Sequence, residues 1–169
     1  INGGVINSIN NNAKLGKGEW AVLEADESDG SFLKLPINYS IVTNIDHEHM
    51  DYYKNYNNLE KSFLKFINRT PPIGKCIICL DDKNIKKIRK KIKTKNILSY
   101  GFDKNSDYQI INTKFNNKNS KFDLLVKNFF GKKKIIKNIY LNLIGKYNIL
   151  NSTAAICVCI NLGIKIDII

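Results

Sequence analysis

Short continuous runs of apolar residues recur through the first two-thirds of the chain. They lie at 19–25 (EWAVLEA), 39–45 (YSIVTNI), 75–80 (KCIICL) and 96–102 (NILSYGF). Runs of this length, with many β-branched residues and little alternation, are typical of strands that are buried on both faces of a parallel sheet. Each run therefore predicts a strand.

Stretches with helical spacing separate the later runs. Between 57 and 68, Leu59, Phe63, Phe66 and Ile67 form one apolar stripe, and the PPIG sequence that follows ends the helix. A second, lysine-rich amphipathic stretch follows the next predicted strand. Strands that alternate with helices predict the α/β class, here a mainly parallel, doubly wound sheet flanked by helices.

The pattern changes after about residue 107. The segments DYQIINTKF, SKFDLLVKN and KNIYLNLIG are short and are separated by turns rich in Asn, Lys and Gly, so they predict a small antiparallel β meander attached to the main sheet. The last segment, KYNILNSTAAICVCINLG, predicts a helix that ends at Gly163. We expect residues 1–169 to form a single domain.

The charge of the chain raises the question of a polyanionic partner. There are 27 Lys and Arg residues against 15 Asp and Glu, a formal net charge of +12, and lysines cluster at 83–95 and 131–137. In the first cluster Ile85, Ile88 and Ile92 keep helical spacing, so the lysines are expected on the solvent face of a helix. No nucleic-acid motif is recognisable, and we expect no nucleic-acid partner. A basic α/β module that binds RNA or another polyanion is the alternative.

The cysteines fall within apolar segments, Cys76 and Cys79 in a predicted strand and Cys157 and Cys159 in the last predicted helix. The C-x-x-C spacing could mark half a zinc site or a redox pair. In a strand, however, residues three apart point to opposite faces, and no histidine is near either pair. Buried, reduced, structural thiols are the favoured interpretation.

The ends of the chain and its hydropathy bear on its context. No apolar run is long enough to span a bilayer and no charged-then-apolar leader opens the sequence, so we expect a cytoplasmic protein without a membrane partner. The chain begins with Ile1, its single Met is Met50, and it stops at GIKIDII. We therefore expect an internal piece of a longer polypeptide, truncated at both ends.

Residues with chemical potential concentrate in two loops that follow predicted strands. The first, EADESDGSF (24–32), holds Glu24, Asp26, Glu27 and Asp29, and the second, TNIDHEHMD (43–51), holds both histidines of the chain. Ligands bind at the carboxyl ends of parallel strands, so the two loops are expected to meet. Hydroxyl, amide, carboxylate and imidazole groups together predict a site for a hard cation such as Mg²⁺.

Each loop also has a plainer interpretation. The acidic loop could simply be solvated, or Asp29 or Ser31 could cap the next helix. The HEH sequence at 47–49 could bind zinc, but the chain has no third histidine and its cysteines lie in apolar segments. The occurrence of both loops at successive strand ends favours the cation site.

These residues resemble a known family. The segment NAKLGKGEWAVLEADESDGSFLKLPINYSIVTNIDHEHMDYY (12–53) is similar to the central, ATP-binding domain of the Mur ligases. Its E-A-D-E-S-D-x-S-F and T-N-I-x-x-x-H-M-D patterns most resemble the member that joins L-alanine to UDP-N-acetylmuramate. GKYNILNSTAA (145–155) resembles a third motif, G-x-H-N-x-x-N-x-x-A-A. The resemblance covers nearly the entire chain and implies a P-loop-NTPase-like fold and an ATP-dependent, amide-forming ligase of bacterial peptidoglycan synthesis.

The resemblance also implies roles for individual residues. Glu24 would bind Mg²⁺ between the phosphates of ATP and the reacting carboxylate, and His49 would be the second metal-site and catalytic residue. Asn148 and Asn151 would contact adenine, although either could instead cap the helix. Tyr147 stands where the family usually has His, and it can still stack on adenine. The groove for the UDP-sugar would be lined by Thr43, Asn44 and Ser28.

Some parts of the family pattern are not found in this chain. Family members carry a G-x-x-G-K-[ST] phosphate loop before this region, an N-terminal domain that grips the uridine nucleotide, and a C-terminal domain that closes over ATP. We therefore expect this piece alone to be inactive. The implied substrates are UDP-N-acetylmuramate and L-alanine. A sister ligase that acts on recycled murein peptide is the alternative, and the serine of ESDGSF argues against it.

Overall fold

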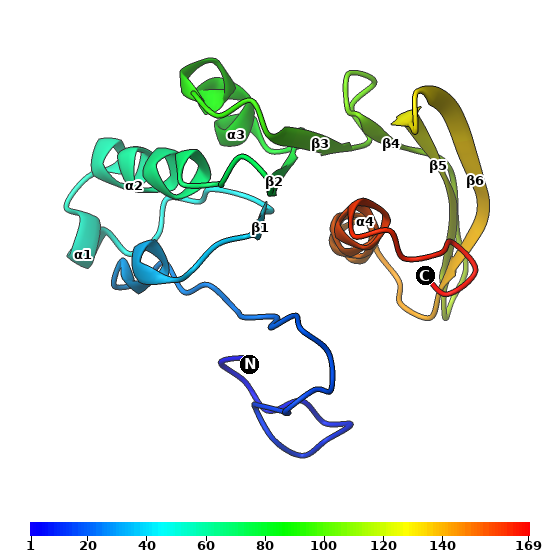
Figure 1. Ribbon diagram of the computed structural model, residues 1–169, viewed down its shortest axis with the longest axis horizontal. Coiled ribbons are helices and arrows are strands. Elements are labelled where there is room, and N and C mark those ends of the chain that lie inside the picture. The colour runs from blue at the N-terminus through cyan, green and yellow to red at the C-terminus, as the bar shows by residue number, and fades with distance from the viewer.

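A six-stranded sheet organises the computed structural model, which describes residues 1–169 (Figure 1). The strands lie side by side in chain order, with β1 to β4 parallel and β5 and β6 antiparallel. Their bounds are β1 (Tyr39–Val42), β2 (Lys75–Cys79), β3 (Ile97–Gly101), β4 (Tyr108–Phe115), β5 (Ser120–Phe129) and β6 (Lys132–Leu141). The α/β class, the parallel first half and the antiparallel meander are thereby confirmed.

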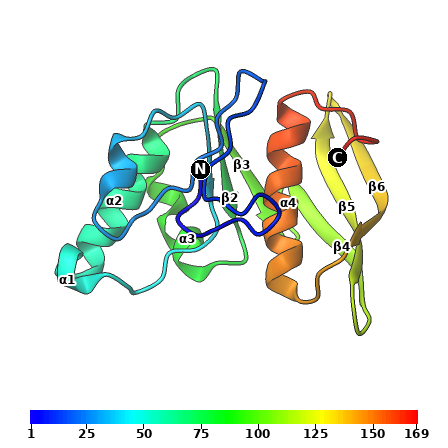
Figure 2. The ribbon, with the colours of Figure 1, turned by 90° about the horizontal axis from the view of Figure 1, so that it is seen from below.

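Helices cover both faces of the parallel part of the sheet. They are α1 (Met50–Tyr53), α2 (Tyr56–Asn68), α3 (Lys83–Ile88) and α4 (Lys146–Asn161), together with the 3₁₀ turns η1 (Ser31–Lys34) and η2 (Arg89–Lys91). In Figure 1, α2 and α3 lie on one side of β1–β3 and α4 lies on the other. Figure 2 shows α4 between this region and β4–β6, which curve around it.

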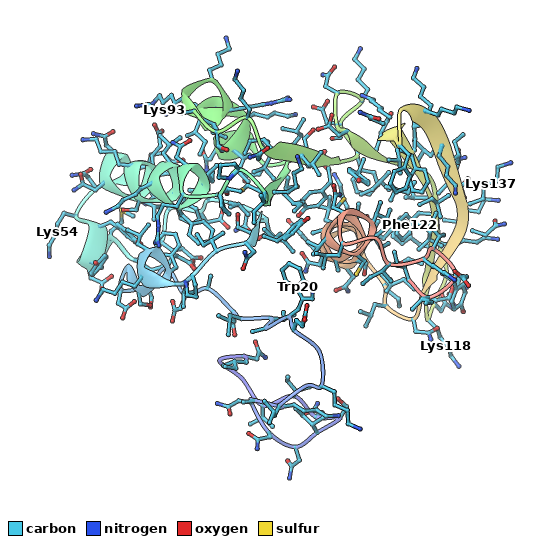
Figure 3. The ribbon with its side chains drawn as sticks, viewed as in Figure 1. Trp20, Lys54, Lys93, Lys118, Phe122 and Lys137 are labelled. Carbon is cyan, nitrogen blue, oxygen red and sulfur yellow. The ribbon has the colours of Figure 1, made fainter.

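The core follows the predicted apolar patterns. Ile77 and Ile78 are adjacent in β2 and both are fully buried, as a strand covered on both faces requires. Ile85 and Ile88 of α3 are also fully buried, while the lysines between and after them are exposed. Figure 3 shows the same division: Phe122 of β5 points toward α4, and the labelled lysines project outward.

The connection between β3 and β4 is unusually short for parallel strands, which normally need a crossover of a dozen or more residues. It is possible because β4 begins where β3 ends, so that the two pair only at Tyr100↔Tyr108 and Gly101↔Gln109. The carboxylate of Asp107 closes the join by accepting hydrogen bonds from the backbone N–H of Ser99 (2.8 Å) and from its hydroxyl (2.6 Å).

The predicted strand at 19–25 is wrong. The segment makes no ladder, and Trp20 and Val22 are 55% and 83% exposed. Its backbone instead bonds to the start of the chain: the N–H of Glu24 donates to the carbonyl of Ile1, and the amino group of Ile1 donates to the carbonyl of Val22. A buried parallel strand needs neighbours on its edges and cover on its faces, and the described residues give this segment neither.

An apolar groove of about 610 Å³ separates this segment from the free edge of β1. It is lined by parts of 19–25 and 35–41, and by Phe66, Val158 and Leu162. The rings of Trp20 and Tyr39 meet edge to face across it, with centroids 5.7 Å apart. The groove therefore lies where a neighbouring strand of β1 would be, away from the predicted site residues of the second loop.

Two smaller differences concern helices. The predicted helix over 83–95 ends at Ile88 and continues only as η2, and Asn68 accepts backbone hydrogen bonds from Lys93 and Thr94 after the chain has left the helix. The single-turn α1 was not predicted.

No helix in the structure combines the length and the hydropathy needed to cross a membrane.

The cysteines are all unpaired, and Cys76, Cys79 and Cys157 are buried while Cys159 is half-buried. Burial raises the pKa of the Cys76 thiol to about 11, which keeps it protonated and unreactive near neutral pH. These positions agree with the interpretation of the thiols as packing groups.

Candidate functional site

The carboxyl ends of β1, β2 and β3 lie at one edge of the sheet, together with the first turn of α4. Asn84, in α3 after β2, donates a hydrogen bond to the carbonyl of Ile45 in the loop after β1 (2.6 Å). Asp81, two residues after β2, accepts hydrogen bonds from the backbone N–H groups of Phe102 and Asp103 after β3 (2.8 and 3.1 Å). These bonds hold the loops of the three strands together.

The start of α4 is joined to the same edge. The ammonium group of Lys146 lies over the ring of Phe102, 4.8 Å from its centroid. Asp82 caps α3 by accepting the N–H of Ile85 (2.7 Å), and burial raises the pKa of its carboxyl. Pairwise contacts thus connect the loop after β1 to the start of α4 through the segments that follow β2 and β3.

The two predicted loops meet at His49. Its Nε2 atom lies 3.6 Å from Oε1 of Glu27 and 3.9 Å from Oε2 of Glu48. The hydroxyl of Tyr53 donates to the backbone carbonyl of Glu27 at 2.5 Å, which ties α1 to the acidic loop. Residues from the first loop and from the second thus lie against each other at the end of β1.

Local turns shape the acidic loop. Asp26 accepts the N–H of Ser28 and Asp29 accepts the N–H of Ser31, both at 2.8 Å. Hydrogen bonding from the backbone and side chain of Ser28 lowers the pKa of Asp26, and hydrogen bonding from the side chain and backbone of Ser31 lowers the pKa of Asp29. Neither Asp29 nor Ser31 caps the next helix as the alternative expected, because the N-cap residue of η1 is Gly30 and no side-chain cap hydrogen bond forms there. Two of the four carboxylates build the loop.

Glu24 has a different environment. Its carboxylate is exposed and accepts the N–H of Gly3 at 2.5 Å, so it bonds to the start of the chain. It forms no ion pair with His49, whose carboxylate neighbours within 4.0 Å are Glu27 and Glu48. Sequence reasoning did not single out Glu27 within the acidic cluster.

The donor groups at this edge can be compared with the needs of a metal ion. No group of three or more His, Cys, Asp or Glu side chains has the spacing to enclose a metal ion. Magnesium commonly takes one or two protein side chains and completes its shell with waters and substrate phosphates. The acidic loop and His49 offer carboxylate and imidazole donors that fit that kind of open site and do not fit a closed zinc site.

Thr43 and Asn44 form a short polar chain after β1. The Thr43 hydroxyl donates to Oδ1 of Asn44 (2.8 Å), and the Asn44 amide donates to Asp46 (2.5 Å). Both side chains are exposed, whereas Ser28 is half-buried in the acidic loop. Thr43 and Asn44 thus face solvent at the same edge as His49.

The first two turns of α4 present the third predicted group. Tyr147 is 82% exposed and Asn151 is exposed, while the amide of Asn148 donates to the carbonyl of Ile144 (2.8 Å). No side chain caps this helix, whose N-cap residue is Gly145 with φ 109°. The capping alternative is therefore not observed for Asn148 or Asn151.

Phe102 and Lys146 are further residues of this edge that the sequence analysis did not assign. A usable signal existed for Phe102, because it is the last residue of the strand predicted at 96–102. Lys146 carries no such signal: its position over Phe102 depends on how α4 docks.

The chain matches known proteins along nearly all of its length. A family model of the Mur ligase middle domain matches residues 5–159. The UDP-N-acetylmuramate–L-alanine ligase of Pelagibacter ubique is 53% identical over 170 residues, which cover 100% of this chain and 36% of that protein. The enzyme of the same name from Brucella anthropi is 40% identical, over 99% of this chain and 36% of that protein. The chain thus spans about a third of the length of these relatives.

Solved structures show the same fold. MurF from Acinetobacter baumannii superposes with a TM-score of 0.64 at 19% identity, over 82% of this chain and 29% of that chain. MurF ligase from Thermotoga maritima, solved in complex with ADP, gives a TM-score of 0.59 at 14% identity, over 80% and 30% of the two chains. From the family match and the close relatives, we conclude that this chain belongs to the Mur ligase family, of which it carries the middle domain.

Proposed function

We propose that this chain is the central part of an ATP-dependent ligase that joins L-alanine to UDP-N-acetylmuramate in the bacterial cytoplasm. The relatives of that name are similar along the whole chain, which supports the substrate pair. The observation that carries the proposal is the meeting of the acidic loop with His49, at the edge that also holds the first turn of α4.

Glu24 and His49 are the proposed protein ligands of Mg²⁺. The ion, when bound with ATP, would neutralise the negative charge that phosphoryl transfer concentrates between the phosphates and the attacking carboxylate. Glu24 is exposed and its only side-chain hydrogen bond is to Gly3 near the chain start, so a rearrangement of residues 1–24 would free it for the ion. His49 already faces the acidic loop.

The remaining residues are proposed to hold the organic parts of the substrates. Asn148 and Asn151, three residues apart on α4, present amide groups that can pair with the adenine edge, and the exposed ring of Tyr147 can stack on the base. The groove for the UDP-sugar is proposed to include Thr43, Asn44 and Ser28.

The reaction proceeds by two transfers. An oxygen of the substrate carboxylate attacks the γ-phosphorus of ATP, the bond to ADP breaks, and an acyl phosphate forms. The amine of L-alanine then attacks the acyl carbon, phosphate leaves, and the amide remains after the amine loses its proton. The chain contributes positioning and charge neutralisation to the first transfer.

The lysines of 83–95 do not favour the polyanion alternative. Lys86 pairs with Asp103 at 2.6 Å, and Lys87 and Lys91 pair with Glu60, which is only 4% exposed. Three of these cations thus have acidic partners within the domain, and they attach α3 and η2 to their neighbours.

The proposed reaction is tested with the complete gene product that contains this chain. With UDP-N-acetylmuramate, L-alanine and ATP, we expect one phosphate released for each amide formed, measured by phosphate release and by mass spectrometry of the product. Robust product with a recycled murein peptide, and none with L-alanine, would assign the chain to a sister ligase instead.

We predict that residues 1–169 expressed alone show no turnover in the same assay, because this piece spans only 36% of the length of the relatives. The measurement is phosphate release with all three substrates, with the complete gene product as the positive control. A turnover number within tenfold of the control would contradict the assignment of the chain to part of an active site.

A further inference from the structure

Glu27 is the carboxylate that the structure places against His49. Its Oε1 atom lies 3.6 Å from Nε2 of His49, and the two side chains, from separate loops, are 38% and 34% exposed. Both are therefore partly shielded from solvent, in contrast to Glu48, whose side chain is 70% exposed at 3.9 Å from the same nitrogen.

The backbone of the acidic loop is fixed to α1, the helix that His49 precedes. Tyr53 is 4% exposed and its hydroxyl donates to the carbonyl of Glu27. Gly30, with φ 74°, lies so close to the Tyr52 hydroxyl that an added Cβ would stand 2.5 Å from it. Glu27 is thus held at a set position relative to His49 by a contact at its own carbonyl and by a second contact three residues later.

His49 itself has an unfavourable backbone conformation. Its φ of 56° and ψ of 36° lie in the left-handed region, which non-glycine residues seldom adopt. Its carbonyl accepts the N–H groups of Tyr52 and Tyr53, both at 3.0 Å, which stabilises this conformation. Strain of this kind is concentrated at functional positions, where it directs a side chain.

We propose that Glu27 is a positioning residue for His49 in the cation site. This rests on the proposed function, in which His49 meets the divalent cation. With Nε2–H of a neutral imidazole donated to the Glu27 carboxylate, the lone pair on Nδ1 is left to bind the ion, and the ring is oriented toward it. Carboxylates commonly serve metal-binding histidines in this way. The distance of 3.6 Å is longer than a hydrogen bond, and such contacts tighten when the substrate complex forms.

Glu48 provides a matched control. It follows His47 and directly precedes His49, carries the same charge, and lies at a similar distance from Nε2, but its side chain is mostly solvated. A general effect of negative charge near His49 would act through both residues. A positioning effect would act through Glu27 alone.

The experiment measures Mn²⁺ binding to the complete gene product in the presence of a non-hydrolysable ATP analogue. Affinity is determined by electron paramagnetic resonance titration, and the nitrogen hyperfine coupling to Mn²⁺ reports directly whether an imidazole is bound. We expect Glu27→Gln to weaken Mn²⁺ binding by about 10-fold or more and to reduce the nitrogen coupling. Glu48→Gln should change the affinity by less than about 2-fold, and Glu27→Asp should recover part of the loss.

The outcomes separate this inference from the proposed function. If His49→Gln weakens Mn²⁺ binding and Glu27→Gln does not, Glu27 has no positioning role while the metal role of His49 stands. Equal losses for Glu27→Gln and Glu48→Gln would also overturn the inference, because they indicate charge alone. If His49→Gln changes neither affinity nor coupling, the proposed metal role of His49 fails, and the role of Glu27 fails with it. If Glu27→Gln does not fold, Glu27→Asp decides, since it should retain the nitrogen coupling.

Discussion

Glu24→Gln in the complete gene product should lower the rate of ATP-dependent amide formation by on the order of 10²–10³-fold. The substitution keeps the size of the side chain but removes the negative charge that is proposed to hold Mg²⁺ beside the reacting phosphate. The folded state should change little, because the Glu24 side chain is exposed and has one hydrogen bond, to Gly3. The measurement is the initial rate of phosphate release at saturating UDP-N-acetylmuramate, L-alanine and ATP.

Glu19→Gln is the matched control for this change. Glu19 is an exposed carboxylate in the same unpaired segment, five positions before Glu24, and it has no proposed role in the reaction. Its substitution should leave the rate within about 2-fold of the unmodified protein, as is usual for an exposed side chain without specific contacts. Equal rates for the two variants would remove Glu24 from the proposed site.

Gly74→Ala should lower the free energy of unfolding by about 3 kcal/mol, at the upper end of what an added methyl group costs in a packed interior. Gly74 lies just before β2, and a Cβ atom there would stand 1.8 Å from the carbonyl oxygen of Asn38, just before β1. Backbone atoms form this contact, so no side-chain rotation can relieve it. The two strands would have to separate at their amino ends. The measurement is chemical denaturation followed by circular dichroism.

Gly18→Ala is the control for the stability change. An added Cβ at Gly18 meets nothing within 4 Å, so its unfolding midpoint should be nearly unchanged. If Gly74→Ala is as stable as Gly18→Ala, then β1 and β2 do not approach each other as the structure has them, and the geometry of the edge that carries the site would need revision.

The part of the fold that could be predicted from the sequence is the part where burial leaves a readable pattern. β2 and β3 were recognisable because a strand covered on both faces has few polar positions, and α2 because Leu59, Phe63, Phe66 and Ile67 recur on one face and are buried together. The single turn of α1 could not be found in this way, because four residues are too few for a periodic signal.

The segment at 19–25 shows the limit of the same reasoning. Its apolar composition indicates a buried strand, but composition cannot supply the neighbouring strand that burial requires. Here Trp20 and Val22 remain exposed beside an apolar groove along β1. The apolar pattern indicates that the segment could form a buried strand. A strand also needs a neighbouring strand to pair with, and residues 1–169 do not provide one.

The candidate site, like the fold, could be predicted only in part from the sequence. The rule that ligands bind at the carboxyl ends of parallel strands brought the two loops to one edge, where the structure has Glu27 against His49. The sequence could not tell which carboxylate would face the imidazole, because Glu24, Asp26, Glu27 and Asp29 are chemically alike. The choice is made by backbone turns, in which Asp26 and Asp29 bond to the N–H groups of serines two positions later.

The acidic loop and the loop after β1 are proposed to hold one divalent cation together with the phosphates of ATP. The most direct test is a crystal structure of the complete gene product with Mn²⁺ and a non-hydrolysable ATP analogue, in which anomalous scattering locates the ion. We expect one Mn²⁺ ion bound directly by a carboxylate oxygen of Glu24 and by an imidazole nitrogen of His49, at about 2.0–2.3 Å, and also by phosphate oxygens. An ion bound to the phosphates with neither Glu24 nor His49 in its coordination shell would contradict it.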